Sequence, residues 1–295
     1  MTAASSSTLR VGMGQMLVEP GCLRNNLRRA VRMIRDAAQQ GCQVVVLPEC
    51  LDLGWTHPSA RQHAQPIPGP SAEALSQAAS DAKIDVVAGL TERAGDRIYN
   101  AAVLVDGDGR LLARHRKINI LEIAQDLYSV GDQLSVTKAS WGTVGIAVCA
   151  DNFPDSHCLG HALARMGAQI VLSPCAWAVP PDHDNRQEPY GELWKGSYAT
   201  LARLYEMPMV GVSNVGLITE GPWQGRKCIG CSLAVGGQGE VVFQAPYGED
   251  AECLGIVDLE LTPRRYRGTA IAPMLRAKGY EAGIATDRGD ADGPA

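Results

Sequence analysis

Apolar residues fall into two alternating patterns along this chain. Short runs of branched apolar residues predict buried strands at residues 9–16, 44–47, 86–90, 101–106, 111–117, 144–148, 170–172, 209–213, 228–235, 241–244 and 252–258. Longer segments with apolar residues at helical spacing predict helices at residues 23–40, 71–83, 155–166 and 192–206. Strands and helices are therefore predicted to alternate along most of the chain.

This alternation indicates a layered α/β fold, not a helical bundle or a sandwich of strands alone. Glycine-rich stretches at residues 107–109 and 236–239 predict hairpin turns between neighbouring strands. The spacing of the elements fits one doubly wound sheet as well as two stacked sheets. The pattern alone leaves both architectures open.

Three isolated reactive residues, Glu49, Lys117 and Cys149, each stand at the end of a strand-like run. Side chains at strand ends emerge where loops begin, which is where α/β proteins build active sites. A thiol with an ordinary pKa is only slightly ionised at neutral pH, so a nucleophilic Cys149 needs a nearby base or cation. Glu49 and Lys117 are the candidates for these two roles.

Composition and charge narrow the class of protein. The chain has 295 residues, of which 45% are hydrophobic and 20% charged, and a formal net charge of -5, as is typical of a globular protein with a large core. No dense basic run is present, so we expect no nucleic-acid partner; the five arginines within residues 24–35 alternate with apolar residues and indicate a solvated helix face. The sequence shows no signal-peptide pattern and no apolar run of about eighteen residues, so we expect a cytoplasmic protein with no membrane partner.

Nine cysteines are scattered along the chain, mostly in apolar contexts, which favours reduced and buried thiols. Cys228 and Cys231 form one CxxC pair, but no second Cys pair and no nearby His complete a metal-binding set. We therefore expect structural cysteines, no metal and no cofactor.

Several short motifs follow one another in a specific order. Three contain the reactive residues, and five softer motifs accompany them: 46–49, 116–118 and 148–154, then 66–70, 99–102, 173–177, 213–216 and 229–232. In order and spacing over residues 9–280, these motifs resemble the nitrilase superfamily of carbon-nitrogen hydrolases. Members of that superfamily use a Glu, a Lys and a nucleophilic Cys in this chain order.

The resemblance implies a four-layer α-β-β-α sandwich in a single domain, residues 9–280, which assembles as a homodimer or larger homo-oligomer. It also implies a small-molecule substrate, either an amide or an N-carbamoyl compound. Residues 1–8 are predicted to be disordered, and residues 281–295, rich in Gly, Ala and Asp, to form a flexible tail.

The resemblance also implies a mechanism. Cys149 attacks the carbonyl carbon of the substrate and forms a thioester. Glu49 takes the thiol proton, passes it to the leaving nitrogen and later activates water. The ammonium of Lys117 and the backbone N–H of Ala150 hold the oxyanion.

A further acidic residue often assists in this superfamily, on the loop between the Lys and Cys strands. The acidic candidates here are Glu122 and Asp126, while the position expected from typical spacing holds Ala124. We favour Glu122 because its side chain has the longer reach.

The residues after the nucleophile bear on the substrate. Nitrilases of the superfamily usually carry Trp-Glu there, whereas this chain has residues 150–152 as Ala-Asp-Asn, which favours amide or carbamoyl hydrolysis over nitrile hydrolysis. Carbamoyl amino acid hydrolases commonly carry arginines there, which grip the substrate carboxylate in two hydrogen bonds. Asn152 and Phe153 therefore disfavour a substrate with a free α-carboxylate, unless Arg186 or Arg226 arrives from a loop.

The residues expected to bind the substrate are Ala150, Asn152, Trp177, Tyr190 and Trp223. The three aromatic residues are expected to form an apolar site for the acyl group, whereas Trp194, on a predicted helix, is expected to pack in the core. A Pro- and Asp-rich insertion at residues 180–189 predicts a surface loop near the site.

Other functions stay open on the sequence. An acyltransferase or a nitrilase of the same superfamily would use the same three residues. A non-catalytic binding subunit would keep the fold without turnover. The joint presence of Glu49, Lys117 and Cys149 favours a hydrolase, with a Cys149 thioester as intermediate.

Overall fold

Two six-stranded sheets form the centre of this protein, whose computed structural model describes residues 6–280. The first sheet has the strand order β15 (Cys253–Leu261), β1 (Ser7–Gln15), β2 (Val44–Val46), β3 (Asp85–Ala94), β4 (Arg97–Val105) and β5 (Leu111–Arg116). The second has the order β14 (Val241–Gln244), β13 (Leu233–Val235), β10 (Met209–Ser213), β8 (Ile170–Cys175), β7 (Gly142–Ile146) and β6 (Val136–Ala139). A small third sheet contains β11 (Val215–Leu217), β12 (Lys227–Ile229) and β9 (Ala178–Val179).

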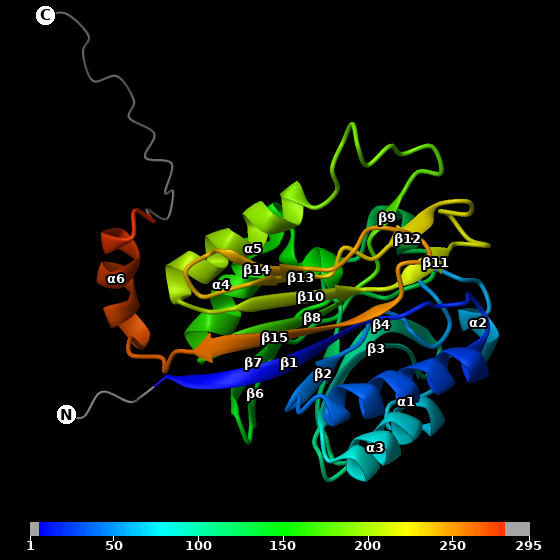
Figure 1. The fold of residues 1–295 in the computed structure, drawn as a ribbon, viewed down its shortest axis with the longest axis horizontal. Helices are drawn as coiled ribbons and strands as arrows, with labels where there is room; N and C mark the ends of the chain where they lie inside the picture. Colours follow the sequence, from blue (N-terminus) through cyan, green and yellow to red (C-terminus); the bar gives the residue numbers. More distant parts are fainter. Residues whose placement is uncertain (1–5, 281–295) are drawn as a thin grey trace, which may run out of the picture. The chain divides into compact units, whose positions relative to one another are not determined.

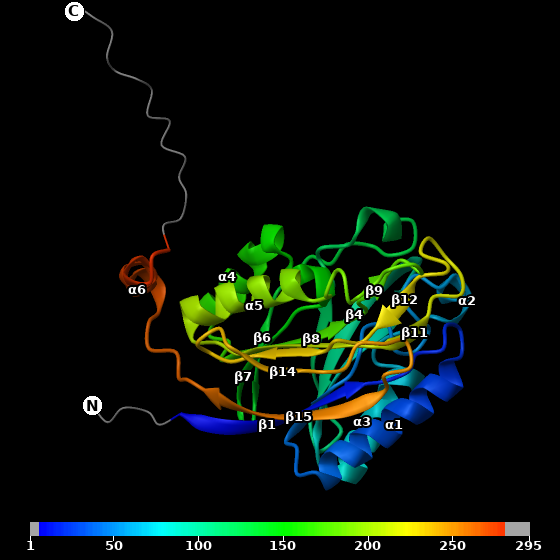
Figure 2. The ribbon, with the colours of Figure 1, turned by 45° about the horizontal axis from the view of Figure 1, so that its top comes forward.

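The two large sheets face each other and are covered by helices on their outer faces (Figures 1 and 2). Strands β1 and β3 of the first sheet contact β10 and β8 of the second. Helices α1 (Leu23–Gln39) and α3 (Pro70–Ala82) cover the first sheet, and α4 (His157–Met166) and α5 (Glu192–Tyr205) cover the second. The predicted four-layer α-β-β-α sandwich is therefore confirmed. Of the two architectures that the spacing left open, the protein has two stacked sheets and not one doubly wound sheet.

The remaining helical elements are short. They are α2 (Ala60–His63) and the 3-10 turns η1 (Glu122–Ala124), η2 (Cys149–Asn152) and η3 (Pro154–Ser156). After Arg264 a separate unit begins, with the 3-10 turn η4 (Gly268–Ala270) and helix α6 (Ile271–Ala277). Among the described residues, no helix combines the length and apolarity that crossing a bilayer requires.

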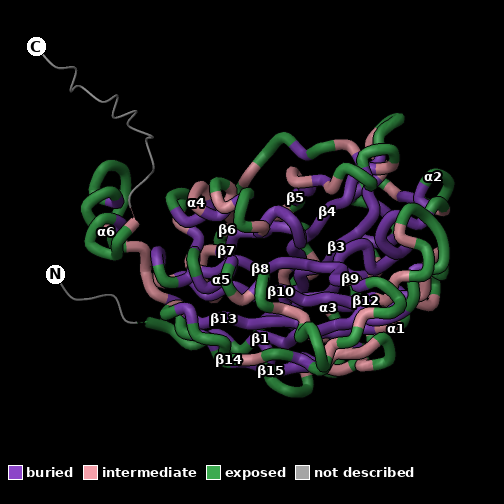
Figure 3. Tube along the Cα trace, turned by 90° about the horizontal axis from the view of Figure 1, so that it is seen from above, coloured by how far each residue is buried: buried purple, intermediate pink, exposed green. Residues whose placement is uncertain are grey.

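The apolar pattern explains these layers. Helix α1 joins the parallel strands β1 and β2, and α3 joins the parallel strands β2 and β3, so each helix must lie across a face of the sheet. Strand β2 is then buried on both sides, and all three of its valines are inaccessible to solvent. Figure 3 shows the same concentration of buried residues in the central strands.

Most predicted elements occur within a few residues of their expected bounds. Both predicted hairpin turns are confirmed, since β4 pairs antiparallel with β5 and β13 with β14. The predicted strand 228–235 is interrupted, because Gly230 and Cys231 adopt positive φ angles of 65° and 57°. Two strands, β12 and β13, therefore replace it.

The predicted disordered segment 1–8 and the predicted flexible tail 281–295 fall largely outside the described residues. The exception is at the start of β1, where Ser7 pairs with Leu261 and Thr8 with Glu260 of β15. The predicted disorder is therefore wrong for Ser7 and Thr8, which are strand residues. Their pairing with β15 is a long-range interaction, and the short polar sequence around Ser7 and Thr8 does not reveal it.

Gly89 in β3 lets the chain pass close to the residue that follows β2. A Cβ atom at this position would lie 2.5 Å from the Cα of Glu49 and 2.7 Å from the carbonyl oxygen of Pro48. Both neighbours are backbone atoms, and two hydrogen bonds hold this segment against Gly89. The N–H of Gly89 donates to the carbonyl of Pro48, and the N–H of Leu51 donates to the carbonyl of Gly89. A side chain here would therefore push the backbone of Glu49 out of place.

We predict that Gly89→Ala lowers the free energy of unfolding by about 1–3 kcal/mol, as overpacking of a buried site does. Chemical denaturation measures this change. The matched control is Gly196→Ala, because a Cβ at Gly196 would meet no atom within 4 Å and this exposed position lies inside α5. Alanine there is expected to be neutral or slightly stabilising. Equal stability of the two variants would contradict the argument from close approach.

Candidate active site

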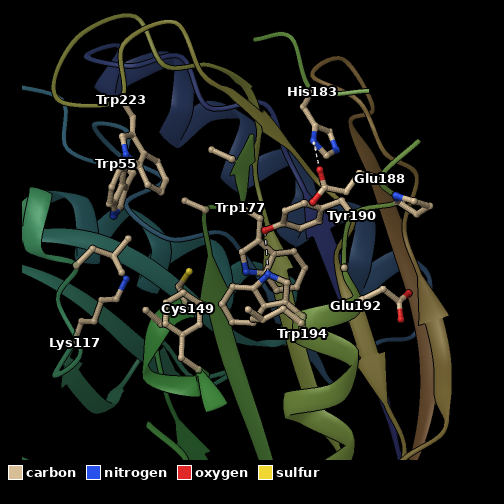
Figure 4. Close-up of a pocket in the computed structure, with 18 residues that line it drawn as sticks. Trp55, Lys117, Cys149, Trp177, His183, Glu188, Tyr190, Glu192, Trp194 and Trp223 are labelled. Atoms are coloured by element: carbon tan, nitrogen blue, oxygen red, sulfur yellow. Dashed lines mark hydrogen bonds and ion pairs between the residues drawn. The ribbon is translucent and has the colours of Figure 1, made fainter. Parts of the chain in front are cut away.

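Three strand ends bring the predicted reactive residues to one place. Glu49 lies three residues after β2, Lys117 directly follows β5, and Cys149 lies three residues after β7. Their exposed fractions are only 1%, 2% and 8%. Lys117 and Cys149 line the same pocket, as Figure 4 shows, and Glu49 accepts a hydrogen bond from Lys117.

A buried ion pair joins Lys117 to Glu49. The Nζ of Lys117 donates to Oε1 of Glu49 at 2.7 Å, and Nδ2 of Asn100 donates to the same oxygen at 2.5 Å. Burial lowers the pKa of Lys117, but the opposing effects, led by the charge of Glu49, outweigh it, so the pKa lies above its ordinary value and the ammonium stays charged. The other oxygen of Glu49, Oε2, is buried and has no hydrogen-bond partner among the described residues. It is an unused acceptor next to a fixed positive charge.

Cys149 stands on a constrained turn at the start of η2. Its φ angle is 45°, which is uncommon for a residue other than glycine, and such outliers cluster at functional sites. Its backbone N–H donates to Oγ of Ser173 at 3.1 Å. The hydrogen bond with Cys175, burial and the charge of Glu49 raise the pKa of Cys149, against the opposing effect of Lys117. A thiol whose pKa is raised in this way needs a nearby base to act as a nucleophile.

The carboxylate of Asp151 connects the Lys117 segment to the Cys149 turn. Its Oδ1 accepts from the backbone N–H groups of Ile118 and Asn119 at 3.0 and 2.7 Å. Its Oδ2 accepts from the N–H of Val148 at 3.0 Å and lies 2.8 Å from Nε2 of His115. Burial raises the pKa of Asp151, but these contacts, led by the one with His115, outweigh it and hold the pKa below its ordinary value. One ionised side chain thus fixes two of the three reactive residues relative to each other.

The pocket above these residues has a volume of about 310 Å³, and six of its eighteen lining residues are Trp, Tyr or Phe. Its lining comprises Trp55, Lys117, Leu121, Cys149, Ala150, Phe153, Ala176, Trp177, Ala178, His183, Glu188, Pro189, Tyr190, Gly191, Glu192, Leu193, Trp194 and Trp223. Such a volume lies at the lower end of the roughly 300–1,000 Å³ of small-molecule sites. The pocket is therefore large enough for a small organic molecule.

Four of the five predicted substrate-binding residues line this pocket: Ala150, Trp177, Tyr190 and Trp223. Asn152 does not, because it lies beneath the nucleophile. Its Nδ2 donates to the carbonyl of Cys149 at 3.3 Å and to Oγ of Ser173 at 3.0 Å. The structure thus places Asn152 as a support of the Cys149 turn.

The structure does not bring Glu122 to the site. Glu122 begins the turn η1 with an exposed side chain, and Asp126 is exposed as well, so neither lines the pocket. Ala124, at the spacing expected for an assisting acid, is buried and has no acidic group. The carboxylate that contacts Lys117 is that of Glu49.

Several site residues were not singled out from the sequence. Asn100 lies in the motif 99–102 but holds Glu49 only because β4 neighbours β3. Trp55 lines the pocket from a loop that has no sequence signal of its own. Trp194 both packs in the core, at 4% exposure, and lines the pocket. The predicted surface loop 180–189 does lie near the site, since it contributes His183.

The arginines that the sequence left open do not line the pocket. Arg226 instead places its guanidinium 4.3 Å from the ring centre of Trp223. Cys228 and Cys231 are buried free thiols, and the described residues contain no group of three or more His, Cys, Asp or Glu suited to hold a metal ion.

Comparison with known proteins shows the family of this chain. The profile of the carbon-nitrogen hydrolase family matches residues 10–265, which is most of the chain. The chain belongs to the carbon-nitrogen hydrolase family. This finding confirms the resemblance to the nitrilase superfamily that the ordered motifs predicted.

Relatives of this carbon-nitrogen hydrolase carry amidase and nitrilase names. Omega-amidase NIT2 of Xenopus tropicalis is 33% identical over 179 residues, which cover 57% of this chain and 63% of that protein. The match therefore spans less than two thirds of the length of that relative. A nitrilase of Pyrococcus abyssi is 31% identical over 257 residues, covering 85% of this chain and 88% of that protein.

Solved structures confirm the fold of this hydrolase. Nit3 of Saccharomyces cerevisiae, a member of branch 10 of the nitrilase superfamily, superposes with a TM-score of 0.72 at 24% identity. The superposition covers 94% of this chain and 97% of that structure. At this identity the similarity concerns the arrangement of the sheets and helices.

We predict that Asp151→Asn destabilises this hydrolase at neutral pH, because an amide NH₂ would face donors that now meet a carboxylate. A carboxyl whose folded pKa is lowered stabilises the fold above its unfolded pKa of about 3.9, and this stabilisation is lost as the pH falls through the folded pKa. The difference in unfolding temperature between wild type and variant should thus be largest at pH 7 and should decrease below about pH 4.

Thermal unfolding from pH 3 to 7 measures this difference. The control is Asp258→Asn, which removes the exposed ion pair with Arg10 and should have little effect. Equal melting temperatures of the two variants at pH 7 would contradict the role given to Asp151.

A second prediction concerns Glu122. We expect Glu122→Gln to keep the turnover of wild type within about twofold, since exposed side chains away from a site rarely affect it. Initial rates on any hydrolysed substrate measure this effect. A loss of a hundredfold or more would give Glu122 the assisting role that the sequence favoured.

Proposed function

We propose that this chain hydrolyses the C–N bond of a small amide or N-carbamoyl compound through a thioester on Cys149. The observation that carries the proposal is the buried Lys117–Glu49 pair beside the Cys149 thiol, in a pocket with aromatic walls. Nucleophile, base and oxyanion partner are the components that acyl transfer through a thiol requires.

The first half of the reaction forms the thioester. The Sγ of Cys149 bonds to the carbonyl carbon while its proton passes to the free Oε2 of Glu49. Negative charge develops on the carbonyl oxygen, where the ammonium of Lys117 and the N–H of Ala150 stabilise it. The intermediate collapses as Glu49 returns the proton to the leaving nitrogen, and ammonia or an amine departs.

The second half regenerates the enzyme. Glu49 takes a proton from water, the resulting hydroxide attacks the thioester carbon, and the C–S bond breaks. The carboxylic acid is released, and Cys149 recovers its proton. For a carbamoyl substrate the product acid is a carbamic acid or its breakdown products.

Asn100 is a positioning residue in this scheme. Together with Lys117 it occupies Oε1 of Glu49, so the proton transfers fall to Oε2, the oxygen without a partner. The fixed bond on one oxygen also holds the carboxylate plane, which supports the geometry that proton transfer requires.

Amides are favoured over nitriles as substrates. The omega-amidase name of several relatives supports amide hydrolysis, and the Ala-Asp pair after Cys149 departs from the Trp-Glu of typical nitrilases. The nitrilase name of the Pyrococcus abyssi relative keeps nitriles as the second candidate. On the resemblance alone, we further infer a cytoplasmic homo-oligomer.

Ammonia release from primary amides, carbamoyl amines and nitriles tests the proposal. We expect release from amides or carbamoyl amines by wild type and none by Cys149→Ala, which leaves a small apolar residue on the turn. We expect Glu49→Gln to lower kcat by about 10²–10⁴-fold, the typical contribution of a general acid-base residue.

Unchanged near-ultraviolet circular dichroism of both variants is the control for folding. Turnover by Cys149→Ala near the wild-type rate would overturn the proposal. Release of ammonia from nitriles alone would replace amide hydrolysis with the second candidate, and transfer of the acyl group to added amines without acid formation would indicate an acyltransferase.

A further inference from the structure

Two pairs of aromatic rings stand on opposite sides of the pocket. Trp177 and Trp194 are stacked, with ring centres 4.9 Å apart and planes inclined by 24°. Trp55 and Trp223 meet at 4.6 Å with planes inclined by 46°. Figure 4 shows the first pair beside the sulfur of Cys149 and the second pair across the pocket, above Lys117. A molecule bound over Cys149 therefore lies between two indole pairs.

These rings are more than core packing. Trp177 is only 2% exposed, yet its Nε1–H has no hydrogen-bond partner among the described residues. A buried donor without a partner costs free energy, and most such donors in proteins are paired. By contrast, Nε1 of Trp194 donates to the hydroxyl of Tyr190 at 3.0 Å. The free donor of Trp177 points to a bound group with an acceptor.

The charges around the pocket disfavour an anionic acyl group. Among its described lining residues the only lysine or arginine is Lys117, whose charge is already matched by Glu49. The lining carboxylates of Glu188 and Glu192, with side chains 87% and 76% exposed, lie toward solvent. A carboxylate on the substrate would lose hydration and meet no unpaired lysine or arginine in the lining.

A cationic acyl group is disfavoured as well. The guanidinium of Arg226 stacks on Trp223 at 4.3 Å, so one ring of the far pair already has a cation. A second cation on that ring would be repelled by this guanidinium.

We infer that the acyl group of the substrate is an uncharged planar ring, held between the Trp177–Trp194 pair and the Trp55–Trp223 pair. This inference rests on the proposed function and names its substrate class. Offset or tilted aromatic contacts add about 0.5–1.5 kcal/mol per pair beyond the area they bury. A flat ring gains this contact on two sides, whereas an aliphatic ring of similar size does not.

The first test compares substrates of wild type. Ammonia release is measured from phenylacetamide, from cyclohexylacetamide as its non-planar match, from the monoamide of glutaric acid as the anion, and from trimethylammonioacetamide as the cation. We expect kcat/KM for phenylacetamide to exceed each of the other three by at least about tenfold, the product of two aromatic contacts. A higher value for the anion or the cation would overturn the inference while leaving amide hydrolysis established.

The second test uses a variant pair. Trp223→Leu should lower the ratio of kcat/KM for phenylacetamide over that for cyclohexylacetamide by about five- to tenfold, whereas Trp223→Phe, which keeps a ring, should largely retain it. The matched control is Trp141→Leu, since Trp141 lies at the turn between β6 and β7, outside the pocket, and its ratio should match wild type. An unchanged ratio in Trp223→Leu would overturn the inference.

A binding measurement separates failure of the inference from failure of the proposed function. Calorimetry with Cys149→Ala compares the affinities of phenylacetamide and cyclohexylacetamide without turnover. Tighter binding of the planar amide by about fivefold or more would support the aromatic slot even if wild type released no ammonia. Equal affinities would overturn the slot even if amides were hydrolysed.

Discussion

The charges of Lys117 and Glu49 meet at 2.7 Å in a region that excludes solvent, and the rest of the structure must hold them there. Neither ion is stable alone at such burial, because leaving one partner uncompensated costs about 3–5 kcal/mol. The pair therefore requires that the end of β5 and the segment after β2 stay in register across β3 and β4. Gly89 permits that approach, and Asn100 supplies the extra hydrogen bond that a buried carboxylate needs.

The position of Cys149 relative to the ion pair also depends on the packing of the whole fold. Cys149 belongs to the second sheet and Lys117 to the first, so their relative position depends on how the two sheets pack. Asp151 secures this position, since its two oxygens accept backbone hydrogen bonds from both segments. The four-layer fold is thus the means by which three strand ends, far apart in the sequence, form one site. Two pairs of tryptophans line the pocket above that site.

The elements and residues that could be predicted are those marked by a pattern among residues close together in the sequence. Runs such as the valines of β2 are apolar because both faces of the strand are covered, and helix α1 is visible because one face of it meets a sheet. The three reactive residues were predicted because each lies in a motif attached to a strand end. The two hairpins were predicted because glycine is needed at their turns.

Features that depend on long-range pairing were missed. Strands β9 and β11 have two and three residues, and both depend on pairing with β12. Trp55 enters the pocket from a loop whose path is set by tertiary packing, so no pattern in the sequence places it. Asn152 has the polarity of a substrate contact, but the turn of η2 directs its amide to Ser173.

The central claim is that the acyl group passes through a covalent bond to Cys149. It is tested most directly by mixing the enzyme with a hydrolysed amide, quenching in acid within the first turnovers, and mapping the modified peptide by mass spectrometry. The predicted result is an added acyl group on Cys149 alone, which disappears as substrate is exhausted and is absent from Cys149→Ala. Turnover without any adduct in wild type, together with turnover by Cys149→Ala, would contradict the claim.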